Sequence, residues 1–315
     1  MMYLYALAFS FLVVVLLVPV VRKLALRVGF VDRPTRRKIH AAPVPLSGGV
    51  AIYIGVVLTA YLFVRDIALF RAIAVGGGLL VATGLVDDAF KAFNREFPVW
   101  PRLILYTLAS LIPVWYGIRI AGISSPSSSS MILFTPGWSL VFTVIWVFAL
   151  LNMVNFIDGI DGLASGICVI SSLTLFIAAL IGYQQVTALI AVALAGACMA
   201  FLTYNFHPAR IFMGDAGATF LGYTLAVTAI EGTLKGATFV SLLVPVLALG
   251  VPILDTAIVF IRRLAEGKGL HRADNLHTHH SLMKWGLTQV QTVSFLYLIA
   301  AVFGLMSIVV MLMLY

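Results

Sequence analysis

The first 21 residues, MMYLYALAFSFLVVVLLVPVV (residues 1–21), contain no charged side chain and decide what kind of fold the chain can adopt. About 18 or more uninterrupted apolar residues are enough to cross the hydrocarbon core of a bilayer as a helix. Arg22 and Lys23 follow the stretch and no basic segment precedes it. We therefore expect a retained first span with its N-terminus outside, not a cleaved signal peptide.

The composition extends this prediction to the whole chain. Of 315 residues, 62% are hydrophobic and 10% are charged, whereas a soluble domain carries about a quarter charged residues. Helices satisfy their own backbone hydrogen bonds in lipid, and the short alternating segments of a β-barrel do not occur. We predict an all-α integral membrane protein, one polytopic domain over residues 1–315, with about ten transmembrane helices at roughly 2–21, 45–64, 67–86, 102–121, 138–154, 163–182, 185–204, 216–233, 237–261 and 291–313.

The basic residues indicate how these spans are oriented. With residue 1 outside, sixteen of the twenty Lys and Arg residues fall in inner connections, which is the bias that the positive-inside rule describes. We expect a multi-pass protein of the cytoplasmic (inner) membrane. This orientation, together with attraction to anionic membrane lipid, accounts for the net charge of +8 and gives no indication of a nucleic acid. It also places the following polar residues on the cytoplasmic side: His40, His207, His271, His277, His279, His280, Asp87, Asp88, Asp158, Asp161 and Asp215.

The motif GLVDDAFKAFN (residues 84–94) closes the third span with the adjacent carboxylates Asp87 and Asp88. Two ionised neighbours are costly unless a cation compensates them, and Lys91 stands one turn after Asp88. A hydrated pair of helix-end acids is the alternative interpretation. Because further acidic motifs are expected at the same membrane face, we favour a functional one.

The motif NMVNFIDGIDGLASG (residues 152–166) places Asn152, Asn155, Asp158 and Asp161 three residues apart. On helical turns this spacing gives a polar stripe, and the interspersed glycines allow close approach of the backbone to a ligand. A helix cap would need only one such side chain. The pattern therefore favours ligand binding over simple capping.

The motif NFHPARIFMGDAGATFLG (residues 205–222) places Asp215 at a glycine-lined helix start. Asp215 is a candidate N-cap and also a candidate ligand for a hard cation, since Mg²⁺ favours one or two carboxylates plus phosphate oxygens. Mn²⁺ is an alternative ion. Phe212 offers a ring to a nucleobase or to core packing. Cys168 and Cys198 lack metal-ligand spacing, so a zinc site is disfavoured.

The stretch ADNLHTHH (residues 273–280) contains three of the six histidines. Carboxylates that hold a divalent ion, together with Arg, Lys and His donors, are the equipment of phosphoryl transfer. We therefore interpret His277, His279 and His280 as part of a phosphate clamp. Asp255 lies inside the ninth span behind Pro245 and Pro252, so we expect a broken ninth helix in which Asp255 is either functional or a partner at the bend.

These motifs occur in the order found in a known family. GLVDD, NxxNxIDGIDGLASG, FMGDAGATFLG, PILDT followed by RR, and ADNLHTHH resemble the polyprenyl-phosphate N-acetylhexosamine-1-phosphate transferases, and most closely the bacterial undecaprenyl-phosphate N-acetylglucosamine-1-phosphate transferases. The similarity extends to RKIHAAPVPLSGGVAIYIG (residues 37–55) and covers essentially the whole chain. Thr278, within the H-x-H-H spacing, distinguishes it from the muramyl-pentapeptide translocase branch with its three consecutive histidines.

The resemblance implies ten transmembrane helices and a cytoplasmic-face active site. It implies Mg²⁺-dependent transfer of N-acetylglucosamine 1-phosphate from UDP-N-acetylglucosamine to undecaprenyl phosphate, with release of UMP. Asp215 would be the metal ligand with Asn155 as a neighbour, and Asp87, Asp88, His279 and His280 would be catalytic. The substrate-binding residues that we predict are Lys38, His40, Lys91, Asn155, Asp158, Asp161, Asn205, Phe212, Arg272 and His277.

Several alternatives remain open at this stage. The donor could be another UDP-N-acetylhexosamine, and transfer could be direct or proceed through an aspartyl-phosphate. The product would start a cell-envelope glycan such as teichoic acid or lipopolysaccharide, and a homodimer is compatible with the sequence. A proton-coupled transporter would carry its ionisable residues near the midplane of repeated halves, and a CDP-alcohol phosphotransferase would carry a longer acidic and arginine pattern.

Overall fold

The computed structural model describes residues 1–32, 43–93, 95–124, 131–234, 243–265 and 277–314. Most of these residues are helical, and the few strands form two short antiparallel pairs, β1 (Val31–Asp32) with β2 (Val44–Pro45) and β3 (Gly122–Ser124) with β4 (Met131–Leu133). The helices are α1 (Met2–Val28), α2 (Gly48–Phe63), α3 (Ile67–Arg71), α4 (Gly77–Ala92), α5 (Val99–Trp115), α6 (Pro136–Ile157), α7 (Leu163–Ile181), α8 (Gln185–Asn205), α9 (Gly214–Ala229), α10 (Leu243–Ala248), α11 (Gly250–Ala265), α12 (Thr278–Lys284) and α13 (Gln289–Leu314). The predicted all-α class is confirmed.

Six helical segments in the described ranges are long and apolar enough to cross a membrane. They are α1, α6, α7, α8, α13 and the continuous segment from Ile67 to Ala92, in which one π-helical turn joins α3 to α4. The helices α2 and α5 are apolar but shorter. Each of the ten predicted spans overlaps a helix among the described residues, and the number that cross the bilayer stays a prediction.

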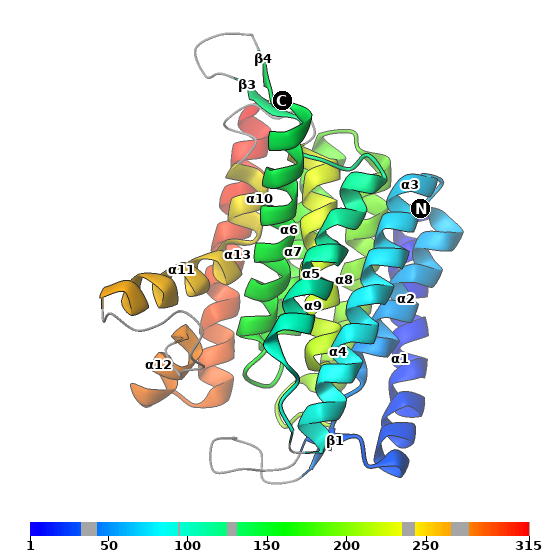
Figure 1. The fold of residues 1–315 in the computed structure, drawn as a ribbon, viewed down its shortest axis with the longest axis vertical. Helices are drawn as coiled ribbons and strands as arrows, with labels where there is room; N and C mark the ends of the chain where they lie inside the picture. Colours follow the sequence, from blue (N-terminus) through cyan, green and yellow to red (C-terminus); the bar gives the residue numbers. More distant parts are fainter. Residues whose placement is uncertain (33–42, 94, 125–130, 235–242, 266–276, 315) are drawn as a thin grey trace.

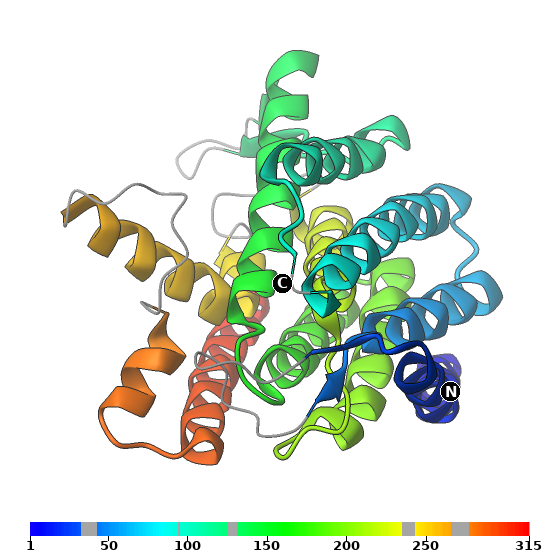
Figure 2. The ribbon, with the colours of Figure 1, turned by 60° about the horizontal axis from the view of Figure 1, so that its bottom comes forward.

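The ninth predicted span is broken, as expected. α10 runs along the bundle and ends at Ala248, whereas α11 starts at Gly250 and projects sideways (Figures 1 and 2). Pro252 is tolerated because it lies in the first turn of α11, where backbone N–H groups have no partner within the helix. The short helix α12 lies beside α11 at the lower end of the molecule in Figure 1, and both chain termini lie toward the opposite end.

α9 forms the centre of the bundle, and its residues from Ala216 to Ala229 are all buried. Its neighbours approach closely because glycines face it: a Cβ at Gly49 would overlap the backbone of Gly217, and a Cβ at Gly84 would overlap that of Ala216. Small residues of this kind let helix backbones touch in membrane bundles. The close packing brings the end of α4 against the start of α9.

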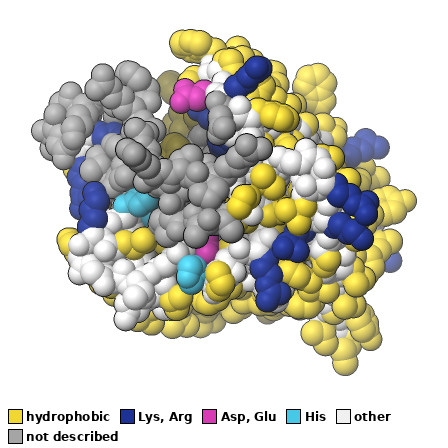
Figure 3. Space-filling view, turned by 90° about the horizontal axis from the view of Figure 1, so that it is seen from below, with side chains coloured by type: hydrophobic (Ala, Val, Ile, Leu, Met, Phe, Trp, Pro, Cys, Tyr) yellow, Lys and Arg dark blue, Asp and Glu magenta, His cyan; other side chains and the backbone are white. Residues whose placement is uncertain are grey.

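The polar end of the bundle is the end at which these two helices meet. Seen from below, it exposes Lys and Arg side chains, with histidine and acidic side chains among them (Figure 3). The connection between α7 and α8, which contains the exposed Tyr183, lies at the opposite end. The polar end thus carries basic, acidic and histidine side chains together, as the sequence predicts for the face that bears the motifs.

The close approach of α4 to α9 gives a first prediction. Gly84→Ala should lower the free energy of unfolding by about 1–3 kcal/mol, because the added methyl group must push the two backbones apart. Activity should fall with it, since Asp215 moves with the start of α9. Thermal unfolding in detergent measures the first effect.

The matched control is Gly137→Ala in the first turn of α6, where an added Cβ would meet no described atom within 4 Å. Alanine favours a helix over glycine by about 0.5–1 kcal/mol, so this variant should not be destabilised. Equal melting temperatures for the two variants would contradict the packing account.

Candidate active site

The site is built around the junction of α4 and α9. Asp87 and Asp88, in the last turns of α4, are 2% and 0% exposed. The Asp88 carboxylate accepts hydrogen bonds from the backbone N–H groups of Asp215 at 3.0 Å and of Ala216 at 3.4 Å. Those groups belong to the first turn of α9, whose N–H groups lack partners within the helix. Asp88 therefore caps α9 from another helix.

Gly214 makes this cap possible. It has a positive φ of 69°, and a Cβ at this position would overlap the Asp88 carboxylate. Glycine adopts positive φ without steric cost. The glycine before Asp215 thus serves both the backbone turn and the approach of Asp88.

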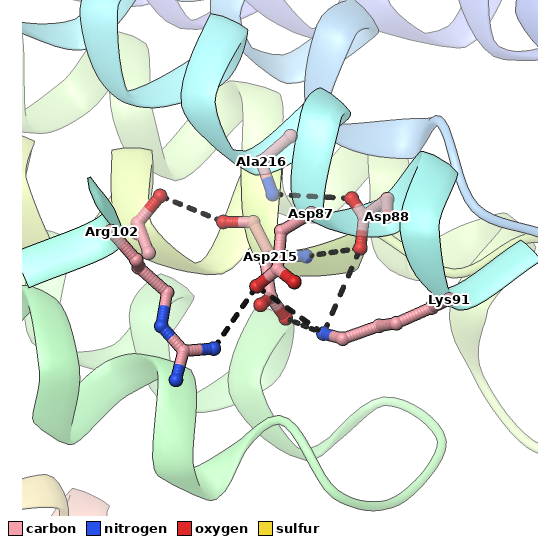
Figure 4. A network of polar contacts seen from close by, with 7 residues as sticks. Asp87, Asp88, Lys91, Arg102, Asp215 and Ala216 are labelled. Carbon is pink, nitrogen blue, oxygen red and sulfur yellow. Dashed lines mark hydrogen bonds and ion pairs between the residues drawn. The ribbon is translucent and has the colours of Figure 1, made fainter. Parts of the chain in front are cut away.

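Lys91 brings positive charge to three carboxylates (Figure 4). Its Nζ lies 2.6 Å from Asp215 Oδ1, 3.9 Å from Asp87 Oδ2 and 4.0 Å from Asp88 Oδ1. A partly exposed ammonium group at this position offsets the repulsion between closely spaced acids. The structure thus joins Asp87, Asp88, Lys91 and Asp215 in one cluster, hereafter the acidic cluster.

Arg102 adds a second positively charged side chain, whose position in the sequence is explained by membrane orientation alone. Its Nη1 donates to Asp87 Oδ2 at 3.2 Å from the first turn of α5. Tyr106, one turn later on the same helix, is 1% exposed, and its hydroxyl has no hydrogen-bond partner among the described atoms. The signal available in the sequence was an arginine just inside the inner end of an apolar span.

The acidic cluster fits the way in which Mg²⁺ binds to proteins. Within the described ranges, no group of three or more His, Cys, Asp or Glu side chains could hold a metal ion by itself. Mg²⁺ commonly takes one or two carboxylates and completes its shell with water and substrate phosphate oxygens. Asp215 is the candidate carboxylate, because Asp88 binds backbone N–H groups and Asp87 binds Arg102, whereas Asp215 is paired with the partly exposed side chain of Lys91.

Asp161 and Asn205 hold two loops together. Asp161 Oδ2 accepts hydrogen bonds from the Ala209 N–H at 3.0 Å and from His207 Nδ1 at 2.8 Å. Asn205, 2% exposed, accepts from the Gly162 N–H and donates to the Ile211 carbonyl. Both polar side chains therefore have partners within the protein that fix the loops flanking the acidic cluster.

Asp158 and Asn155 lie at the end of α6. Burial raises the pKa of Asp158 to about 7, and the negative charge of Asp215 adds to the shift. Asn155 lies in the last turn of the helix, and no hydrogen bond within the described part of the chain joins its side chain to Asp215. The predicted pairing of Asn155 with Asp215 on a metal ion stays a prediction.

Phe212 is fixed by its backbone, which exchanges hydrogen bonds with the segment that leads into α2. Its N–H donates to the Pro45 carbonyl at 2.8 Å, and its carbonyl accepts from the Gly48 N–H at 3.0 Å. The predicted substrate-binding residues Lys38, His40 and Arg272 lie outside the described residues.

The three histidines of the HTHH stretch lie at the start of α12. The rings of His277 and His279 are nearly parallel, with centroids 5.8 Å apart, and those of His279 and His280 are 4.2 Å apart. His279 is 2% exposed, and its Nε2 has no hydrogen-bond partner among the described atoms. A Cβ at Gly159 would lie 2.6 Å from that nitrogen, so His279 faces the loop after Asp158.

The buried environment lowers the pKa values of His279 and His280. Burial lowers the pKa of His279 to about 3, and the charge of His280 adds to the shift. Burial also lowers the pKa of His280, with a further contribution from His277. A neutral imidazole still donates one hydrogen bond and accepts another. The arrangement is therefore suited to hydrogen bonding with a ligand and not to a permanent positive charge.

Comparison with known proteins gives one matching family. Residues 70–233 match the family described as glycosyl transferase family 4. A probable undecaprenyl-phosphate N-acetylglucosaminyl 1-phosphate transferase of Bacillus subtilis is 34% identical over 95% of this chain and 82% of its own length. A decaprenyl-phosphate N-acetylglucosaminephosphotransferase of Mycolicibacterium smegmatis is 34% identical over 88% of this chain and 74% of its own length. An undecaprenyl-phosphate alpha-N-acetylglucosaminyl 1-phosphate transferase of Escherichia coli is 28% identical over 89% of this chain and 76% of its own length.

The low pKa of His279 gives a prediction about pH. Because His279 is neutral throughout pH 6–8, His279→Gln should reduce kcat/KM by a constant factor over this range, reaching about a hundredfold if the ligand is displaced by about 1 Å. The kcat/KM profile reports the ionisations of the free enzyme, so it is the quantity to measure. A profile whose slope between pH 6 and 8 disappears in the variant would show that His279 is charged in the working enzyme.

Proposed function

Because this chain belongs to glycosyl transferase family 4, we propose that it transfers N-acetylglucosamine 1-phosphate from UDP-N-acetylglucosamine to undecaprenyl phosphate and releases UMP. The family resemblance read from the sequence motifs is confirmed. The proposed product is a lipid-linked sugar from which a cell-envelope glycan starts.

The observation that carries the proposal is the acidic cluster, in which the positively charged Lys91 and the neighbouring Arg102 lie beside the carboxylates. Phosphoryl transfer requires positioning of two phosphates and neutralisation of the charge that develops on their oxygens. Lys91 and Arg102 supply positive charge beside Asp87 and Asp215. A transporter site would place such groups near the bilayer midplane, whereas these groups lie at the ends of α4 and α9.

We further propose that Asp215 holds a divalent cation, Mg²⁺ or Mn²⁺. Such an ion, when bound, neutralises charge on the phosphate oxygens of the donor. Lys91, whose ammonium group contacts Asp215, would then turn to a phosphate oxygen, an interaction that lysine makes as a point charge. Asp215 attracts this ammonium group, and the same attraction for positive charge supports its assignment as the residue that binds the divalent cation.

The proposed step is direct. A phosphate oxygen of the lipid attacks the sugar-bearing phosphorus of the donor, the bond from that phosphorus to the bridging oxygen breaks, and UMP leaves with the electron pair. The lipid phosphate, with a second pKa near 6, is largely dianionic at neutral pH and needs no base. Both oxygens of Asp88 accept backbone N–H groups and Asp87 is paired with Arg102, which disfavours either carboxylate as a nucleophile.

The donor's parts are assigned by position in the site. Asp158 and Phe212 lie on the loops beside the acidic cluster and are proposed to bind the nucleotide. His277, His279 and His280 are proposed to bind the sugar phosphate through their imidazole nitrogens. These assignments place the nucleotide toward α9 and the sugar toward α12.

Purified protein with labelled UDP-N-acetylglucosamine, undecaprenyl phosphate and Mg²⁺ should form labelled lipid and UMP in equal amounts. Asp215→Asn, which changes charge but little volume, should reduce the rate at least about a hundredfold, because a metal-held phosphate is worth several kcal/mol in the transition state. UDP-N-acetylgalactosamine in place of the donor tests the sugar. Accumulation of intact UDP-sugar in vesicles without UMP would indicate a transporter and overturn the proposal.

We also propose that this site faces the cytoplasm. A cysteine at Trp285, 76% exposed between α12 and α13, should react with a membrane-impermeant maleimide only after cells are opened. A cysteine at Tyr183, 87% exposed between α7 and α8, should react in intact cells. The native Cys168 and Cys198 are buried and provide the background. The reverse labelling pattern would overturn the orientation.

A further inference from the structure

Asp255 is a buried carboxylate to which the proposed reaction gives no task. It lies in the second turn of the sideways helix α11 and is 4% exposed. Oδ2 accepts a hydrogen bond from His277 Nδ1 at 2.7 Å, and Oδ1 accepts one from the Thr278 N–H at 2.6 Å. Both donors belong to the start of α12, the helix that carries the histidines and is hereafter called the histidine helix. The side chain of Asp255 on α11 therefore fixes its first turn.

The contact with the carboxylate determines where the proton of His277 resides. An ionised carboxylate only accepts hydrogen bonds, so Nδ1 of His277 must carry the hydrogen. In the neutral ring Nε2 is then left as an acceptor. Carboxylates that contact the far nitrogen of a functional histidine fix both its tautomer and its ring orientation.

The orientation of the His277 ring affects the other histidines through ring contacts. Its ring lies nearly parallel to that of His279, at 9°, and also contacts the ring of Phe156. His279 in turn lies against Gly159, and its Nε2 has no hydrogen-bond partner among the described atoms. A change at His277 therefore alters the surroundings of a nitrogen that lies close to the loop beside Asp158.

We propose that Asp255 is a positioning residue of the transferase site, which fixes the tautomer and orientation of His277 and so aligns the histidine helix with the loop at Gly159. This inference rests on the proposed function, because that function assigns the histidines to the donor's sugar phosphate. It links the helix that projects from the bundle to the residues that bind the donor.

A purely structural role for Asp255 makes a different prediction. α11 and α12 have a second described link, in which Arg262 Nη1 donates to Ser281 Oγ at 3.3 Å. If Asp255 only linked the two helices, asparagine at this position would hold them together nearly as well, since its amide oxygen still accepts a hydrogen bond from the Thr278 N–H. The amide nitrogen, however, would donate to His277 Nδ1 and move the ring proton to Nε2.

The test is Asp255→Asn, with kcat and KM measured separately in the labelled-lipid assay. We expect kcat to fall at least about tenfold while KM for the UDP-sugar stays within about threefold, because the ring stays in place with the wrong tautomer; the same substitution in the Asp–His pair of a serine protease lowers kcat by about four orders of magnitude. Wild-type kcat in this variant would overturn the proposal.

Two further variants distinguish control of the His277 tautomer from a purely structural link between α11 and α12. Ser281→Ala removes the second link and should keep kcat near the wild-type value. Asp255→Asn added to His277→Ala should change kcat by no more than about twofold, because residues that act through one another are not additive. A further tenfold loss in the double variant would show that Asp255 acts independently of His277.

A measurement that does not require turnover distinguishes failure of the proposed role of Asp255 from failure of the proposed transferase function. In protein labelled with ¹⁵N-histidine, the His277 signals, identified by their loss in His277→Gln, should be those of the Nδ1–H tautomer in the wild type and of the Nε2–H tautomer in Asp255→Asn. An Nε2–H tautomer in the wild type overturns the positioning role. The expected tautomers in a protein without transferase activity would support the coupling and count against the proposed function.

Discussion

The hydrogen bonds from the start of α9 to the Asp88 carboxylate are the interaction on which the rest of the structure depends. They place a buried carboxyl group at the positive end of the buried helix α9, where N–H groups would otherwise have no partner. Gly84 and Gly214 leave room for the contact. Through it Asp215 is held beside Asp87, Lys91 and Arg102, so the geometry of helix packing becomes the geometry of the site.

The site joins parts of different character. The acidic cluster lies on α4 and α9, where backbone N–H groups hold the Asp88 carboxylate and the side chains of Arg102 and Lys91 hold those of Asp87 and Asp215. The histidines lie on a short helix held by Asp255 from α11, outside the bundle's main axis. This division suits the proposed donor, whose nucleotide would be bound by rigid elements of the bundle, since positioning is most exact on rigid elements.

Much of the fold and part of the site could be predicted from the sequence, for identifiable physical reasons. Apolar stretches of sufficient length indicate spans directly, and Pro252 indicates the break before α11. Acidic residues at span ends point to a site because membrane insertion does not require them. The partners of these residues could not be predicted: Asp88 and Asp215 are 127 residues apart, and Asp255 and His277 are 22 apart. Such pairs arise from helix packing, which a local pattern does not encode. Arg102 was missed because an arginine at the inner end of a span is already explained by orientation.

The central claim is that the acidic cluster is a divalent-cation site centred on Asp215. Electron paramagnetic resonance of Mn²⁺ titrated into the purified protein in the presence of UMP measures this directly, without catalysis. We predict a bound ion in the wild type, and affinity at least about tenfold weaker in Asp215→Asn, since even residues that only support a metal ligand change affinity by about ten- to a hundredfold. Equal Mn²⁺ affinity in the two proteins would contradict the account.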